Sequence, residues 1–291
     1  MRFLLLCLSG LLGCAAPTSP PVGAAPALFV ARDADSTLYL YGSIHLRRAG
    51  EPWGNATVEA ALQEADEIWT EMEISPRTDA ATQQLAQRYG VAPTGRPLSS
   101  WLSEVERTRL QTAAARLGVA PQALEPMQPW LAALTLTLLP VVQAGYEPAA
   151  GVDRAVDAFG DAAGKRMRAF ETPEQQVAFF AGLSGDLQRA MLLEAIDESE
   201  KGVQMLDRLS EAWERGDLSL LERENEAMRR EHPDFHAAII ADRNAAWAAV
   251  LEQELAGAGV DFVTVGAAHL VGEDGLVSLL RARGFAVERM P

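Results

Sequence analysis

The sequence predicts an α/β (or α+β) fold. We expect a central, mainly parallel sheet built from two halves, each containing Gly-x-x-His, with a large helical insertion between them. Residues 37–45 (TLYLYGSIH) and 261–269 (DFVTVGAAH) are rich in β-branched and aromatic residues, as buried strands are. Both runs end in Gly-x-x-His, and each is followed by a helical pattern and a further strand pattern.

The first residues predict export. Residues 1–13 contain Arg2 and then the short apolar run FLLLCLSGLLG, which is typical of a signal peptide and shorter than the ~20 apolar residues of a membrane-spanning helix. The LLGC at 11–14 resembles a bacterial lipobox, which predicts a lipoprotein-type signal peptide with Cys14 as the lipidated first residue. Cleavage near Ala24-Ala25 is the alternative. Residues 14–27 are rich in proline and alanine and predict a flexible tether.

Composition narrows the partners and the location. The formal net charge is −15, which repels phosphate groups, so we expect no nucleic-acid partner. The two cysteines, Cys7 and Cys14, lie in the leader, so a chain acylated at Cys14 has no thiol left for a disulfide. We expect an exported protein of the bacterial cell envelope. It is either anchored by its lipid, with the periplasmic face of the outer membrane as the expected location, or free in the periplasm.

The domain is predicted to span residues 28–291. It begins with a hairpin turned at 33–36, which leads into the first Gly-x-x-His strand. A helix over 54–66 follows, with Asn55 as its N-cap, and then the apolar strand 67–74 (EIWTEMEI). Glu71 and Glu73 should lie on the same side of that strand, because side chains alternate along a strand. The order strand, helix, strand favours a right-handed crossover.

The insertion over about 78–257 is predicted to be mainly helical. Capping-box patterns begin helices at Ser103 and Thr172. Residues 130–142 are very apolar but number only thirteen, so a buried core helix is expected there. A short strand is expected at 166–170, and two helices broken at 216–217 are expected over 186–231.

The second half contains the strand 260–265, a helix over 274–283 and a last strand over 285–290. Ligands of α/β sheets bind at the carboxyl ends of the strands. Both Gly-x-x-His motifs end strands, so we expect His45 and His269 to face one crevice. Gly42 and Gly266 would allow the backbone to approach closely there.

These phrases also carry a family resemblance. GSIH at 42–45, the run 52–74 (PWGNATVEAALQEADEIWTEMEI) and the run 263–290 (VTVGAAHLVGEDGLVSLLRARGFAVERM) are similar to the TraB/PrgY/GumN family, which includes the Tiki proteases. The resemblance extends from about residue 28 to the C-terminus and is densest at the two ends. It implies an α/β fold and, from the Tiki branch, metal-dependent peptide hydrolysis. Composition and spacing alone do not indicate that activity.

The candidate site combines histidines and carboxylates. We expect His45, His269, Glu71 and Glu73 to bind a divalent metal ion, zinc, manganese or cobalt, because imidazole and carboxylate suit all three ions. His45, His269, Glu71 and Arg243 are the candidate catalytic residues, and Glu71 is either a ligand or the base that activates water. The structural alternatives are histidines bonded to the backbone and glutamates in salt bridges at the end of the sheet.

Four further residues match family positions. Arg243 and Asn244 match an Arg-Asn pair that precedes the second strand, and Arg243 is expected to clamp either a substrate carboxylate or the glutamates of the site. A surface salt bridge with Asp242 is the alternative. Glu171 would line the site or stabilise the start of a helix. Asp153 would cap a helix or line the site.

The function predicted from these residues is divalent-metal-dependent hydrolysis of a peptide or protein substrate at the cell envelope. The chain has no HExxH, GxSxG, P-loop or dinucleotide-binding motif, which disfavours the common zinc proteases, serine hydrolases and nucleotide enzymes. Two alternatives remain open. One is a lipoprotein that binds a peptide or signal without turnover, and the other is a metal-dependent hydrolase of another amide or ester.

Overall fold

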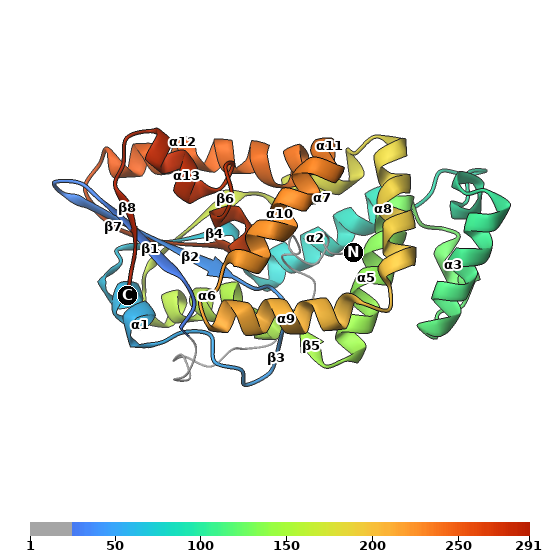
Figure 1. Ribbon diagram of the computed structural model, residues 1–291, viewed down its shortest axis with the longest axis horizontal. Coiled ribbons are helices and arrows are strands. Elements are labelled where there is room, and N and C mark those ends of the chain that lie inside the picture. The colour runs from blue at the N-terminus through green and yellow to red at the C-terminus, as the bar shows by residue number, and fades with distance from the viewer. Residues whose placement is uncertain (1–24) are drawn as a thin grey trace.

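The computed structural model describes residues 25–291 and has a six-stranded central sheet in the order β6-β4-β7-β2-β1-β8. The strands β6, β4, β7 and β2 are parallel to one another, and β1 runs antiparallel to both of its neighbours, β2 and β8 (Figure 1). The mainly parallel α/β sheet is therefore confirmed. The bounds of the strands are β1 Leu28–Arg32, β2 Ser36–Ser43, β4 Glu67–Met72, β6 Arg166–Glu171, β7 Gly259–Gly266 and β8 Val287–Arg289.

The two halves interleave in the sheet. The strand β7 lies between β2 and β4, with Val260 paired to Thr37 and Asp261 paired to Glu67. The last strand, β8, pairs with β1 and not with β7. The two predicted halves therefore share one hydrogen-bonded unit instead of standing side by side. This places the ends of both Gly-x-x-His strands next to each other.

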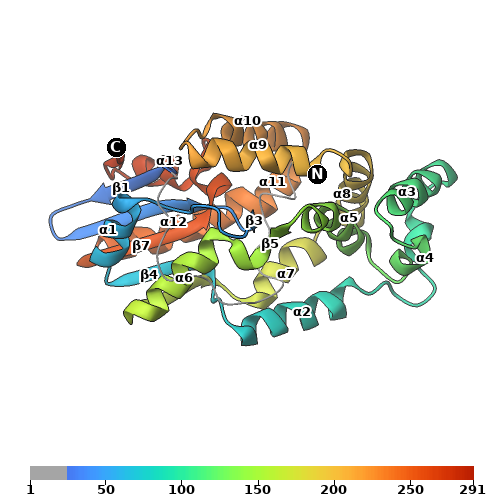
Figure 2. The same cartoon turned by 90° about the horizontal axis from the view of Figure 1, so that it is seen from below.

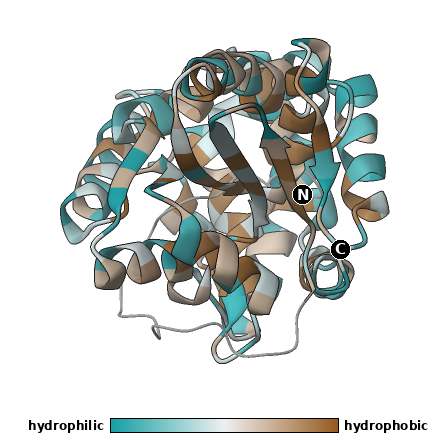
Figure 3. Cartoon of the chain, turned by 90° about the vertical axis from the view of Figure 1, so that its left-hand side faces the viewer, coloured by the Kyte–Doolittle hydropathy of each residue, from teal (hydrophilic) through white to brown (hydrophobic). Residues whose placement is uncertain are grey.

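Helices cover both faces of the sheet (Figure 1). The helices α12 (Asp242–Leu255) and α13 (Leu276–Ala282) pack on the face that carries Leu38 and Leu40. The helices α1 (Ala56–Glu64) and α6 (Val152–Ala163) pack on the face that carries Tyr39 and Tyr41. This alternation along β2 is the strand period of two, and both faces are apolar because both are covered. Figure 3 shows hydrophobic strands inside and hydrophilic stretches on the surrounding helices.

Most of the insertion lies beyond the carboxyl ends of the parallel strands, whereas its helices α6 and α12 pack on the faces of the sheet (Figure 2). It contains β6, as predicted, and the run 186–231 forms three helices, because the chain also breaks between α8 and α9. A separate two-stranded ribbon joins β3 (Arg47–Arg48) to β5 (Tyr146–Glu147). The helices of the insertion are α2 Pro76–Gly90, α3 Glu104–Arg116, α4 Pro121–Leu124, α5 Pro129–Gln143, α7 Pro173–Ala181, α8 Gly185–Glu198, α9 Gly202–Glu214, α10 Ser219–Glu231 and α11 Pro233–His236.

Local sequence signals set several helix starts. Ser103 and Thr172 form the capping boxes of α3 and α7, as predicted, and Ser75 does the same for α2. The apolar helix α5 is largely buried, with Trp130 only 2% exposed, which confirms the core helix expected there. Within residues 25–291, no helix has the length and apolar character needed to cross a membrane.

The domain begins slightly before the predicted boundary. The backbone N–H of Ala25 donates to the carbonyl of Glu214 at 2.7 Å, and Ala27 is buried. The last three residues of the predicted tether therefore contact the domain, because the Ala25 backbone is bonded to the end of α9 and Ala27 packs in the apolar cluster that contains Phe29 and Leu38. The leader and Cys14 lie outside the described residues.

Candidate active site

The carboxyl ends of the four parallel strands supply the site. His45 follows the end of β2, Glu71 lies near the end of β4, and Glu171 is the last residue of β6. His269 lies in a short 3₁₀ turn, Ala267–Leu270, directly after β7. All four side chains are buried. The fold therefore brings both predicted histidines and Glu71 to one place.

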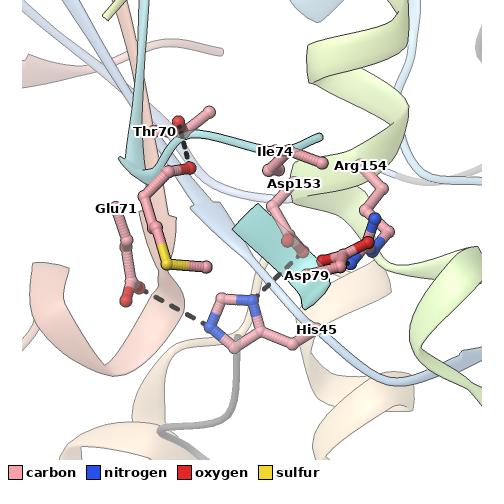
Figure 4. Close-up of a pocket in the computed structure, with 8 residues that line it drawn as sticks. His45, Thr70, Glu71, Ile74, Asp79, Asp153 and Arg154 are labelled. Atoms are coloured by element: carbon pink, nitrogen blue, oxygen red, sulfur yellow. Dashed lines mark hydrogen bonds and ion pairs between the residues drawn. The ribbon is translucent and has the colours of Figure 1, made fainter. Parts of the chain in front are cut away.

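His45 is held between two carboxylates. Its Nδ1 lies 3.1 Å from Oδ1 of Asp153, and its Nε2 lies 3.5 Å from Oε1 of Glu71 (Figure 4). Burial alone would lower the pKa of His45, but the charge and hydrogen bond of Asp153, together with Glu71, outweigh it and raise the pKa to about 10. The two carboxylate oxygens, one on each side of the His45 ring, favour a positive charge at this ring, carried either by a proton or by a metal ion.

His269 has the opposite electrostatic environment. Its Nδ1 lies 2.7 Å from Oδ1 of Asn244, and its Nε2 lies 3.1 Å from Nη1 of Arg243. Burial and the charge of Arg243 lower the pKa of His269 to about 3, so the ring is neutral. Since Arg243 can only donate, Nε2 accepts its hydrogen bond and Nδ1 carries the proton that is donated to Asn244. Asn244 thus orients His269, as Asp153 orients His45.

Glu71 connects the two histidines. Its Oε1 accepts from the backbone N–H of Gly266 at 2.7 Å and lies 3.9 Å from Nε2 of His269. Its Oε2 accepts from Nη2 of Arg243 at 2.7 Å. Burial opposes ionisation of Glu71, but the charge of Arg243 and the hydrogen bond and charge of His45 lower its pKa well below the ordinary value. The carboxylate is therefore ionised at the centre of the site.

Arg243 uses all five of its N–H donors within the protein. Nε and Nη2 donate to the two oxygens of Glu171 at 2.8 and 2.9 Å, and the second Nη2 donor goes to Glu71. Nη1 donates to the carbonyl of Ile239 at 3.2 Å and to His269. A guanidinium has five donors, so none remains for a substrate. Of the two roles predicted for Arg243, the structure favours the clamp on the site's own glutamates.

Neighbouring side chains hold this guanidinium in place. The rings of Phe179 and Trp247 lie 4.9 and 4.7 Å from its central carbon. The π-helical turn Ala237–Ala241 directly precedes α12 and supplies the carbonyl of Ile239. Neither aromatic residue belongs to a motif, so no pattern in the sequence indicated this role.

Glu171 is a supporting residue of the site. Besides Arg243, it accepts a hydrogen bond from Nε2 of Gln176 at 2.6 Å. Burial raises the pKa of Glu171 although Arg243 opposes this shift. Gln176 was missed by sequence reasoning, because a glutamine in the first turns of a helix carries no pattern that points to a site.

The predicted glycines have separate roles. The carbonyl of Gly42 accepts a hydrogen bond from Nε1 of Trp213 at 2.7 Å, and a Cβ on Gly42 would lie 2.9 Å from the Cα of Ala267. Gly42 therefore allows β2 to pack closely on the turn that carries His269. Gly266 acts through its backbone N–H on Glu71.

Glu73 does not join the site. The strand β4 ends at Met72, and the exposed Glu73 side chain accepts a hydrogen bond from Oγ of Ser75 at 3.1 Å. The alternation argument fails because the backbone leaves the strand before residue 73 to enter the cap of α2. The structure therefore leaves Glu71 as the one β4 carboxylate among the predicted ligands.

The residues fit a metal ion in part. Two ligands at 2.0–2.2 Å from a tetrahedral ion lie about 3.4 Å apart, which is close to the 3.5 Å between Nε2 of His45 and Oε1 of Glu71. The hydrogen bonds of Asp153 and Asn244 to Nδ1 are those that orient metal-ligating histidines. His269 would join only after Arg243 Nη1 leaves its Nε2.

A second acidic group lies near the other end of the strands. Among residues 25–291, ligand atoms of three such residues lie within 4.8 Å of one another only in Glu67, Glu254 and Asp261. Nη2 of Arg166 lies 2.8 Å from Glu67 and partly neutralises this group. We assign the chemistry to the His45 site instead, because its histidines are buried and oriented.

The comparison with protein families gives one match. Residues 27–289 match the TraB/PrgY/gumN family, which is nearly the whole described chain. The chain belongs to the TraB/PrgY/gumN family. No curated protein and no solved structure matches the chain. For this member of the family, the site is therefore described from its own side chains.

Proposed function

We propose that the chain is a divalent-metal-dependent hydrolase of peptide bonds. One observation carries the proposal. The Nε2 atoms of His45 and His269 lie 3.5 and 3.9 Å from the same oxygen, Oε1 of Glu71. Their Nδ1 atoms are held by Asp153 and Asn244. Zinc, manganese and cobalt all suit this donor set.

The roles of the residues follow from their contacts. His45 and Glu71 would hold the metal ion, which when bound polarises a carbonyl group and lowers the pKa of bound water. Asp153 keeps Nδ1 of His45 protonated, so that Nε2 presents its lone pair to the ion. Arg243 fixes Glu71 and Glu171, and His269 would become a third ligand only when its Nε2 no longer accepts the hydrogen bond from Nη1 of Arg243. Of Glu71 and His45, a group that does not bind the ion is placed to accept a proton from water.

One observation favours a second candidate, a peptide-binding protein without turnover. In the present arrangement Arg243 donates to His269, so the protein itself satisfies this histidine. A site that kept this bond would bind a ligand beside His45 without assembling a three-residue metal site.

Metal analysis and peptide cleavage test the proposal together. The protein is purified without added metal, its metal content is measured, and cleavage of a peptide library is compared with and without chelator. We expect His45→Ala and His269→Ala to lose metal and cleavage together, and Glu71→Gln to lose cleavage. If Glu71→Gln keeps its metal, Glu71 acts mainly as the base; if the metal is lost as well, Glu71 is a ligand.

The matched control is His232→Ala, which changes a histidine at the end of α10 outside the site. It should keep metal and cleavage. Unchanged cleavage in the double variant of His45 and His269 would refute the metal-dependent hydrolase. Metal-free binding of peptides without cleavage would establish the second candidate.

We also propose that the protein works in the cell envelope, attached through a lipid on Cys14. The support is the LLGC sequence at 11–14. Labelling cells with a clickable fatty acid should mark the wild type and leave Cys14→Ser unlabelled. Equal labelling of both proteins would refute the lipid anchor.

A further inference from the structure

His45 lines two hollows. The first also contains Glu71 and Asp153 and is the polar hollow shown in Figure 4. The second is lined by His45, by Ser43 and by apolar side chains from the end of β2, from α9 and α10 and from the turn after β7. These apolar residues are Ile44, Leu206, Leu209, Leu221 and Ala267.

The second hollow is small. Its cavity volume is about 20 Å³. That is room for about one water molecule, and hence for one methyl group. Leu206, Leu209 and Leu221 are at most 3% exposed, so the surrounding helices fix its size. The side chains of Leu206, Leu209, Leu221 and Ala267 give the hollow apolar walls that suit a methyl group.

Ser43 adds a polar group to this apolar hollow. Its side chain is buried, at 2% exposure, and its Oγ has no hydrogen-bond partner among residues 25–291. An unbonded buried hydroxyl costs about 1–3 kcal/mol, so a polar group that entered the hollow and bonded to Ser43 would offset this cost. The N–H or C=O of a peptide backbone is such a group.

We propose that this hollow is a subsite for a small aliphatic side chain of the substrate, no larger than that of alanine, beside the bond held at His45. The inference rests on the proposed peptide-hydrolase function and names its substrate class. The methyl group would fill the space among Leu206, Leu209 and Leu221. Ser43 Oγ would form a hydrogen bond with the backbone of the same substrate residue and hold that residue against His45.

The first test changes the size of the hollow. Serine-glycine hexapeptides with Gly, Ala, Val or Leu at each position in turn are offered to the full chain, and both kcat/KM and Kd are measured. The wild type should prefer Ala over Leu at one position by about tenfold or more, since each surplus methylene is worth 10–200-fold. Leu209→Ala should shift the preference to Val and Leu, and the milder Leu221→Val covers the case in which Leu209→Ala does not fold.

The matched control is Leu192→Ala in α8. It removes the same atoms from a buried leucine that does not line the hollow, so it should lower stability without changing the preference. If no peptide is cleaved but Kd follows the predicted size order, the hydrolase function fails and the subsite stands. If cleavage occurs and neither kcat/KM nor Kd depends on the size of the side chain, the subsite is refuted.

Ser43→Ala tests the polar part with two readouts. Removing an unbonded buried hydroxyl should leave the free protein as stable as before or more stable. The same change should weaken binding of the alanine peptide about threefold to tenfold, the worth of one hydrogen bond. Unchanged peptide binding would show that Ser43 does not contact the substrate.

Discussion

Asp153 fixes the orientation of the His45 ring. It is the bonding partner of Nδ1, and it lies in the first turn of α6, where the sequence pattern allowed either a cap or a site-lining residue. Asp153→Asn keeps the size of the side chain but removes the charge that fixes the ring. We expect metal affinity to fall about 10- to 100-fold, as it does when the orienting partner of a ligating histidine is changed.

Competition with a chromophoric chelator measures this affinity. The matched control is Asp161→Asn, an exposed position on the same helix, which should leave affinity unchanged. An unchanged affinity in Asp153→Asn would mean that His45 does not bind the metal through Nε2.

Arg243 stabilises the buried carboxylates of Glu71 and Glu171 in the folded protein. Lysine has three donors on one nitrogen and cannot reproduce the double contact with Glu171 or the bonds to Glu71 and His269. We expect Arg243→Lys to lower the free energy of unfolding by about 2–4 kcal/mol, because it leaves buried acceptors unsatisfied.

Urea denaturation measures the loss of stability. The control Arg229→Lys changes an exposed ion pair with Glu226 and should cost less than about 1 kcal/mol. A loss in Arg243→Lys no greater than in the control would contradict the structural role of the five-donor network.

At the scale of the element, α6 carries a pH-sensitive face. Burial and the nearby carboxylates Asp161 and Asp153 raise the pKa of Asp157 to about 7. The folded protein therefore holds a proton that the unfolded chain has already lost. Stability from this group is fully present below the unfolded pKa of about 3.8 and is lost as the pH rises toward 7.

Asp157→Asn removes this dependence. We expect the variant to be more stable than the wild type by about 1–2 kcal/mol at pH 8, after allowance for solvent screening, and little different at pH 4. Thermal unfolding from pH 4 to pH 8 measures the difference. A gap between the two proteins that does not grow with pH would contradict the shift.

Elements marked by local signals were predictable. The capping boxes at Ser103 and Thr172 and the apolar run of α5 needed only neighbouring residues. The position of β7 between β2 and β4 was not predictable, because it depends on pairing between distant segments such as Thr37 and Val260. Glu73 was misplaced because strand alternation holds only while the strand continues, and β4 ends at Met72.

The candidate site divides in the same way. His45, His269 and Glu71 come from strand ends with motifs, so the sequence indicated them and the fold brings them together. Gln176 and the rings of Phe179 and Trp247 reach Glu171 or Arg243 only through the tertiary fold. The sequence therefore predicted the central residues of the site and not the residues that hold them.

At the scale of the whole molecule, the first described residues belong to the domain. A chain that begins at Leu28 loses the hydrogen bond from Ala25 to Glu214 and the burial of Ala27. We expect it to fold with about 1 kcal/mol less stability than a chain that begins at Ala25, or a Tm about 2–4 °C lower. Differential scanning calorimetry of both chains compares the values, and equal Tm values would place the boundary at Leu28.

The interleaved sheet also sets the time at which the candidate site can form. During synthesis, β2 and β4 emerge early, but the strand that must lie between them, β7, comes near the end of the chain. Until then the edges of β2 and β4 that will face β7 have unpaired backbone groups. Pairing of segments so far apart in the chain is slow. The candidate site therefore remains incomplete until β7 inserts, and that one step completes the sheet and brings His269 to Glu71.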